Sequence, residues 1–163
     1  SDIAQLVGIT RAGVLHHFGT KDRLLLAVLE YRDKTDVKKL GGNSYPEGRD
    51  LLKHLVRTVA MNTTRPGIVQ SYAVLSAESV TESHPAQDYF KARFESLRST
   101  LKDSLRNLAP TNTSNQDLEY AAASIVAAMD GLQVQWLLDP EAIDMPASIE
   151  ATIEGLVTWL NRD

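Results

Sequence analysis

Cysteine is absent from the 163-residue sequence, and so are long uninterrupted apolar runs. Without cysteine the chain has no disulfide framework, no thiolate metal site and no cysteine nucleophile, and nothing suggests secretion. No apolar run approaches the ~18 residues that cross a bilayer, and no signal-peptide pattern opens the chain. We therefore expect a cytoplasmic protein with no membrane partner.

The motifs of common enzyme and cofactor sites are absent as well. The sequence contains no G-x-S-x-G, H-E-x-x-H, P-loop or G-x-G-x-x-G pattern, and its carboxylates are scattered as on helix surfaces. We expect no catalytic residue and no cofactor. The length is that of one ordinary domain, or of one domain with a small appendage.

The net charge of -4 looks wrong for a DNA-binding protein until its distribution is considered. Residues 1–39 hold seven Lys and Arg against five Asp and Glu, whereas residues 40–163 hold ten against sixteen. A basic end on an acidic body suits a DNA-facing segment, but a difference of this size carries little weight by itself.

Almost every segment has helical rather than strand periodicity, which predicts an all-α fold of about eight helices. Thr10 and Thr20 are suited to cap helices over residues 11–18 and 21–40. The apolar spacing predicts further helices over residues 49–63, 68–83, 85–108, 118–138 and 146–161. The glycine-rich loop at 41–48 indicates a boundary between an N-terminal part, residues 1–40, and a C-terminal domain, residues 49–163.

The first thirty residues have the layout of a helix-turn-helix followed by a supporting helix. Ala4, Gly8 and Val14 stand where this motif needs a small residue, a turn glycine and an apolar anchor. The second helix would lie in the major groove with its N-terminal residues nearest the bases. The residues expected at the DNA are Thr10, Arg11, Ala12, Gly13, His16, His17 and Lys21.

Two kinds of contact follow from these residue types. Arg11 can donate two hydrogen bonds to a guanine, and the free N–H groups after Thr10 and at Lys21 can bind phosphates. A plain helical hairpin inside a bundle would carry the same small-residue pattern, so the motif alone leaves both interpretations open.

Metal binding is not expected. Adjacent histidines on a helix point about 100° apart, so His16 and His17 cannot share one ion. Glu78, Glu82 and His84 are spaced too loosely to predict a metal cluster.

The full run from Gly8 to Leu29 closely resembles the DNA-binding domain of TetR-type transcriptional repressors. The matching residues are Gly8, Thr10, Phe18, Lys21, Leu24 and Leu25. A second stretch, from Asp130 to Pro140, looks like the penultimate helix of many members. The resemblance implies that Lys21 contacts DNA phosphate.

Three departures from the family pattern bear on this end of the chain. Gly13 stands where serine or threonine is common, and its lack of a side chain would permit close approach to the DNA. Leu15 stands where many members have a tyrosine that reaches a phosphate. The family also begins with a helix before the one that contains Ile3, so we expect that N-terminal residues are missing from this sequence.

The resemblance also implies that the C-terminal helices enclose a ligand pocket, and that the last two pair with those of a second subunit. Aromatic residues with a few polar groups typify a ligand site. The candidates for it are Met61, Tyr72, Ser76, Phe90, Phe94, Asp130 and Gln133. Small residues with large anchors suit packing across an interface. The candidates for it are Ile125, Met129, Trp136, Ile149, Ile153 and Trp159, although all of these would serve equally as the core of a monomer.

The expected function is that of a DNA-binding transcriptional regulator. It would be a homodimeric repressor that binds a near-palindromic operator in double-stranded DNA and is released by a small-molecule effector. The alternatives are a helical protein-interaction module and a small enzyme, both without DNA binding.

Overall fold

The computed structural model describes residues 10–39 and 46–162 of the chain. Over these residues the fold is all-α, as predicted, with no strand. The helices are α2 (Arg11–Phe18), α3 (Lys21–Lys39), α4 (Gly48–Asn62), α5 (Pro66–Glu78), α6 (Gln87–Arg106), α7 (Asn115–Leu138) and α8 (Met145–Leu160). The helix expected around Ile3, with Ala4 and Gly8, lies outside the described residues.

Side-chain caps fix the starts of four helices. The Gly13 N–H donates to Thr10 Oγ1 at 3.0 Å and the Arg23 N–H to Thr20 Oγ1 at 3.2 Å, which confirms both predicted N-caps. Gly19 separates the two helices at φ +79°, a conformation that a residue with a Cβ rarely adopts. Ser114 and Asp144 cap α7 and α8 in the same way.

The segment between α5 and α6 is longer than predicted. The predicted helices over residues 68–83 and 85–108 left only residue 84 between them, but α5 ends at Glu78 and α6 begins at Gln87. Local hydrogen bonds replace the helical ladder here, since Ser79 Oγ donates to the Ser76 carbonyl and His84 Nδ1 accepts from the Ala86 N–H.

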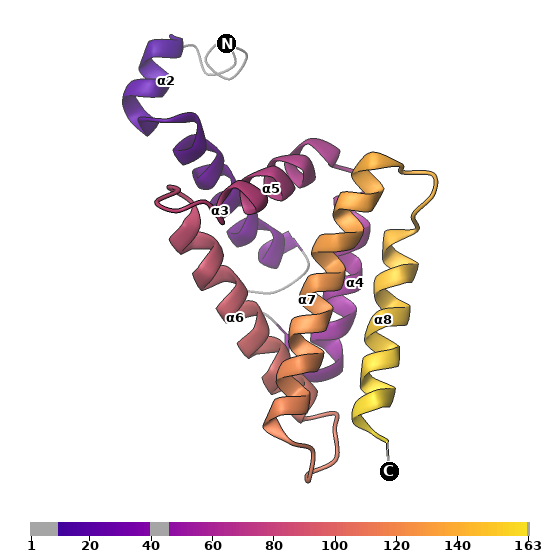
Figure 1. Ribbon diagram of the computed structural model, residues 1–163. Helices are drawn as coiled ribbons and strands as arrows, with labels where there is room; N and C mark the ends of the chain where they lie inside the picture. The colour runs from indigo at the N-terminus through magenta and orange to yellow at the C-terminus, as the bar shows by residue number, and fades with distance from the viewer. Residues whose placement is uncertain (1–9, 40–45, 163) are drawn as a thin grey trace.

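The main core lies among the four helices α4, α6, α7 and α8, with α5 across one end. Helix α7 packs against α5, α6 and α8, and α4 packs against α6 and α8 (Figure 1). The largest fully buried side chains of this core are Leu51, Val59, Val69, Leu101, Leu105, Leu118, Ile125, Met145 and Ile149.

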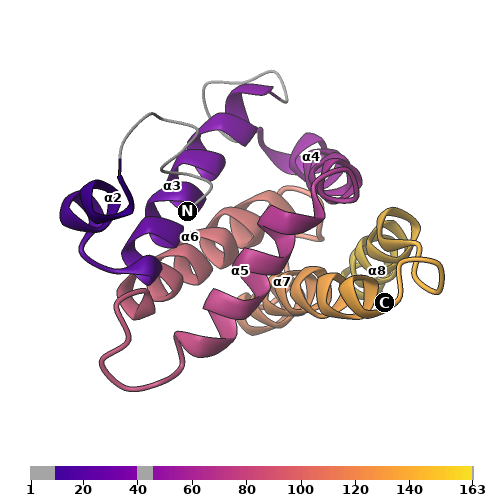
Figure 2. The same ribbon diagram turned by 90° about the horizontal axis from the view of Figure 1, so that it is seen from above.

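A second, smaller core joins α3 to the rest of the molecule. Leu29 of α3 is fully buried against Tyr72 and Leu75 of α5 and Phe90 of α6. Both views show α2 at the end of the molecule opposite α7 and α8, with α3 leading from it to the other helices (Figures 1 and 2). The short helix α2 is therefore attached to the helical body mainly through α3.

Helix α7 is long and apolar enough to cross a membrane by length and composition alone. The expectation of no such segment considered only unbroken apolar runs, whereas α7 reaches this hydropathy through many alanines. Its position between three other helices accounts for an apolar composition in a globular protein.

Two valines provide a matched test of this packing. Val69 of α5 is 0% exposed in the core, and Val80 is 82% exposed after the same helix. Val69→Ala is expected to lower the free energy of unfolding by about 2–3 kcal/mol, because two buried methyl groups are lost and a cavity remains. Val80→Ala should change it by less than about 0.5 kcal/mol. Urea denaturation measures both, and equal effects would contradict the core assignment.

Candidate functional site

The N-terminal end presents short helix α2 with an exposed face. Val14 is buried and holds the helix down, while Thr10, Ala12, His16 and His17 are exposed. Gly13 is half-buried. Arg11 is the first residue of α2, but its side chain, like that of Leu15, lies outside the described part of the chain.

Lys21 is exposed at the first position of α3, directly after its Thr20 cap. Two helix N-termini, those of α2 and α3, thus occur within one short segment. The free N–H groups and partial positive charge of a helix N-terminus favour phosphate. The exposed surfaces of α2 and of the start of α3 combine backbone N–H donors, a lysine and two histidines. These groups are suited to contact the phosphates of DNA.

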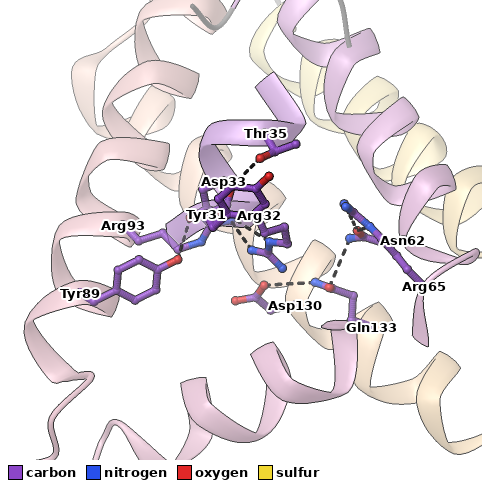
Figure 3. Close-up of polar contacts among 10 residues, drawn as sticks. All are labelled: Tyr31, Arg32, Asp33, Thr35, Asn62, Arg65, Tyr89, Arg93, Asp130 and Gln133. Atoms are coloured by element: carbon purple, nitrogen blue, oxygen red, sulfur yellow. Dashed lines mark hydrogen bonds and ion pairs between the residues drawn. The ribbon is translucent and has the colours of Figure 1, made fainter. Parts of the chain in front are cut away.

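A polar cluster lies on the inner side of α3, where it meets α6. The Asp33 carboxylate accepts from Arg32 Nη2 at 2.9 Å and from Tyr89 Oη at 2.6 Å, and Arg93 Nη1 pairs with it as well (Figure 3). Arg93 also has a buried Nε with no hydrogen-bond partner. One carboxylate therefore serves two guanidinium groups.

Tyr72 of α5 lies beside both arginines. The guanidinium carbons of Arg32 and Arg93 are 4.9 and 5.3 Å from its ring centroid, within the range of cation–π contact. Burial raises the pKa of Tyr72 to about 12, and the charge of Asp130 adds to this. The phenol is thus neutral at physiological pH.

Asp130 of α7 points toward the same space as the arginines (Figure 3). Gln133 Nε2 donates to Asp130 Oδ1 at 3.4 Å, and Asn62 Nδ2 donates to Gln133 Oε1 at 3.5 Å. Burial raises the pKa of the Asp130 carboxyl to about 6, which Arg93 and Tyr72 only partly oppose. The protonation of this group therefore changes near neutral pH.

These side chains surround a small cavity of about 70 Å³. Of the seven predicted ligand-site residues, Tyr72, Asp130 and Gln133 line it. Phe90 is buried in the smaller core and Phe94 packs beside it, while Met61 and Ser76 are half-buried elsewhere on α4 and α5. The last four are not among the residues around this cavity.

Sequence reasoning missed the residues that organise the site, namely Arg32, Asp33, Tyr89 and Arg93. A signal for Arg93 was present, since it falls within the apolar stripe formed by Phe90, Phe94 and Leu97 on one side of a helix. Asp33 likewise follows Leu29 by four residues on the buried side of α3. A charge inside such a stripe must find a partner.

Carboxylates and a histidine also meet near the start of α3. The ligand atoms of Asp22, Glu78 and His84 lie within 4.8 Å of one another, so Asp22 rather than Glu82 joins the group considered from the sequence. His84 Nδ1 accepts the Ala86 N–H at 3.2 Å. A neutral ring with this bond carries its proton on Nε2, so neither ring nitrogen has a free lone pair for a metal ion.

Four of the six predicted interface residues lie in the core of a single chain. Ile125, Trp136, Ile149 and Ile153 are buried there, and Met129 and Trp159 are half-buried. Trp159 lies under the Arg162 guanidinium, 3.9 Å from its ring centroid.

The exposed face of α7 consists of other residues. One stripe of its exposed positions recurs every three or four residues without a charge, at Tyr120, Ala123, Ala127, Gly131, Val134 and Leu138; Glu119, Ser124 and Gln135 are exposed beside it.

The described residues thus form an all-α protein in which a capped N-terminal helix is carried on a long connecting helix, beside a bundle that holds a polar cavity. The model of the family described as "BetI-type transcriptional repressor, C-terminal" matches residues 48–160. The chain therefore belongs to the TetR-type family of transcriptional repressors, in its BetI-type group. Membership in this family indicates a non-enzymatic regulator.

A match to a curated relative supports the same family over nearly the whole chain. The chain is 28% identical over 158 residues to the HTH-type transcriptional regulator BetI of Rhizobium meliloti (strain 1021). The match covers 93% of this chain and 74% of that protein. No solved structure matches the chain.

The raised pKa of Asp130 makes stability depend on pH. Between pH 4 and 6 the folded protein keeps a proton that the unfolded chain has released, so stability falls as pH rises through this range. Asp130→Asn is expected to remove this loss, which amounts to at most about 3 kcal/mol. Denaturant unfolding from pH 4 to 8 should show that the free energy of unfolding of the variant, relative to that of the native chain, increases as the pH rises.

Asp103→Asn, at an exposed aspartate of α6, is the matched control and should leave the pH dependence unchanged. Parallel curves for the native chain and Asp130→Asn would contradict the assigned protonation change.

Proposed function

We propose that this protein is a homodimeric repressor that binds a near-palindromic operator in double-stranded DNA and leaves it when a small-molecule effector binds. The observation that carries the proposal is the capped, exposed α2 on the long helix α3, which packs directly on the residues around the cavity. Such a protein would act in the cytoplasm, where its DNA is found.

Helix α2 would enter the major groove with Arg11, Ala12 and Gly13 nearest the bases. Half-buried Gly13 allows close approach, because it has no side chain beyond Cα. Thr10, His16, His17 and Lys21 would position the helix on the phosphates. A second subunit would place its own α2 in the next major groove, about 34 Å away along the duplex.

The exposed face of α7 supports the dimer. Its stripe from Tyr120 to Leu138 is apolar or small and long enough for a partner helix. A Cβ added at Gly131 of α7, or at exposed Gly155 of α8, would meet no atom of the described chain within 4 Å. Packing within one chain therefore does not require glycine there, whereas close approach of a second chain would.

Release requires that the effector prefer one arrangement of the two α2 helices. A ligand shifts an equilibrium only by its difference in affinity between the two states. A ligand in the cavity touches α3 directly, because Arg32 and Asp33 line it. Movement of α3 would carry α2 with it, so the spacing of the two α2 helices would no longer fit successive major grooves.

Two substitutions separate base reading from phosphate binding. Arg11→Ala is expected to cost ~1–3 kcal/mol and to relax the preference at one base pair, whereas Lys21→Ala should weaken binding to all sequences and lower the salt slope by about 1. Gel shifts with genomic fragments, repeated over a range of salt, measure both. Lys53→Ala, at an exposed position of α4, is the control.

A salt slope near zero for the native chain would exclude the DNA-binding proposal, because neutralised phosphates must release counterions. Uniform loss on Arg11→Ala would instead make Arg11 a phosphate contact.

Two valines with similar exposure provide a matched test of the proposed interface. Val134 of α7 is 48% exposed and Val74 of α5 is 50% exposed. Val134→Glu is expected to convert dimers to monomers, because the charge would be buried without a partner, whereas Val74→Glu should leave the dimer intact. Sedimentation or light scattering gives the mass. Dimers that survive Val134→Glu, or monomers in the native chain, would argue against this face.

A further inference from the structure

We infer that Asp33 determines which spacing of operator half-sites this protein accepts, although its side chain lies away from the DNA. The inference rests on the proposed function and names a positioning residue for it. It is carried by three observations: the attachment of α2 through α3, the ties of Asp33 to α6, and the place of these ties between the proposed dimer interface and the DNA-binding end.

The direction of α3 decides where α2 lies, because α2 packs mainly against α3 and α3 in turn packs against α5. Apolar packing gives α3 one firm point of contact, Leu29, which is fully buried with Leu25 packed beside it. Apolar burial is not directional, so this contact alone would let α3 pivot. A second point is needed to fix the direction of the helix.

Asp33 supplies the second point. Its Oδ2 accepts from Tyr89 Oη at 2.6 Å and pairs with Arg93 Nη1, and these two residues lie one turn apart on α6. Its Oδ1 accepts from Arg32 Nη2 at 2.9 Å, so both oxygens of the carboxylate are held. Charge-assisted hydrogen bonds are short and directional. They therefore fix the position of Asp33 both along α6 and in its distance from that helix.

The place of Asp33 relative to Leu29 amplifies any change in these bonds. Asp33 lies about 6 Å beyond Leu29 along the helix axis, and Lys21 lies about 12 Å from Leu29 in the opposite direction. A shift of Asp33 about the Leu29 pivot therefore moves the start of α3 about twice as far. Base pairs are about 3.4 Å apart, so moving each α2 by about 1.7 Å along the duplex changes their separation by one base pair.

The same contacts connect Asp33 to the proposed dimer interface. Helix α6 is anchored in the main core by the buried Leu101 and Leu105. It packs against α7, whose outer face is proposed to meet the second subunit. The contacts thus run from the partner through α7 and α6 to Asp33, and from there along α3 to α2. Two such arms, related by a two-fold axis, would hold the two α2 helices at one separation.

The effector would have access to this ion pair from the cavity. Asp33 and Arg93 line both the cavity of about 70 Å³ and a groove of about 560 Å³ between α3, α4 and α6. The buried Nε of Arg93 has no hydrogen-bond partner among the described residues, so the guanidinium is not held by all of its donors. A ligand that moves Arg93 would change the direction of α3, and with it the half-site spacing that fits.

Gel shifts with the genomic fragment that the native chain binds test the inference, on duplexes with one base pair inserted or removed between the half-sites. The native chain should lose at least tenfold in affinity with either change. Asp33→Asn keeps an acceptor for Tyr89 but loses the charge that pairs with Arg93, so it should bind the altered duplexes within threefold of the original. Its affinity for a duplex with a single half-site should stay within twofold of that of the native chain.

Glu30→Gln is the matched control, because it removes the same charge from an exposed position of α3. This variant should keep the native spacing preference. Arg93→Lys keeps a positive charge and should retain more of the preference than Arg93→Gln. Tyr89→Phe removes one of the two donors from α6 and should relax the preference in part, so the test does not depend on the folding of one variant.

Spin labels give a second readout that needs no DNA. Because the sequence has no cysteine, Ala12→Cys on α2 and Ala60→Cys on α4 place labels at two exposed positions. Dilution of the labelled chain with unlabelled chain restricts the measured distances to pairs within one chain. The distance distribution should be narrow in the native background and with Glu30→Gln, and broader or displaced with Asp33→Asn.

The inference is overturned if Asp33→Asn weakens binding to all duplexes by the same factor, since that is the effect of a purely structural tie. It is also overturned if the distance distribution of Asp33→Asn matches that of the native background. A native chain that binds no DNA, or that is monomeric, would instead contradict the proposed function, and the spin-label distances would still decide whether Asp33 fixes the direction of α3.

Discussion

The arrangement of α2 and α3 relative to the helical body depends on the ion pair and hydrogen bonds of the Asp33 carboxylate. Helix α3 has few other links to the body, since Leu29 is the one fully buried side chain among those of α3 that the structure describes, while Val28 and Tyr31 are exposed. A partly buried carboxylate is tolerated only with partners, and Arg32, Tyr89 and Arg93 supply them. The position of α3, and with it that of α2, is set by this ion pair as much as by apolar packing.

Such a joint is specific and also open to exchange. A hydrophobic contact depends on area and shape, and little in solution competes for it. An ion pair between Asp33 and Arg93 depends on charge and direction, so a polar or charged group that reaches it competes with it directly. Because the pair lies between a groove and a cavity, access does not require the core to open.

The helices could be predicted from the sequence because their signals are local. Thr10 and Thr20 are caps whose bonds close within three residues, and the apolar repeats of α4 and α7 are visible within one window. The site could not be predicted in the same way. Asp33 and Arg93 are sixty positions apart, and nothing local says that α3 will cross α6 at that point. Likewise, periodicity showed that Ile149 and Ile153 are buried, but not whether the neighbour is the same chain.

Helix α7 brings these points together. Its inner face, with Leu118, Ala122 and Ile125, is fully buried, and its outer face from Tyr120 to Leu138 is also uncharged. A surface helix of one chain should have a polar outer face; a helix that is apolar all round is buried on both sides. The membrane-like composition of α7 is thus what the central helix of a dimer would need. Asp130, the one charge in its middle, is on neither face but at the cavity. The helix proposed to hold two subunits together therefore also lines the site proposed to bind the effector, so a ligand bound there would contact the helix that sets the spacing of the two α2 helices.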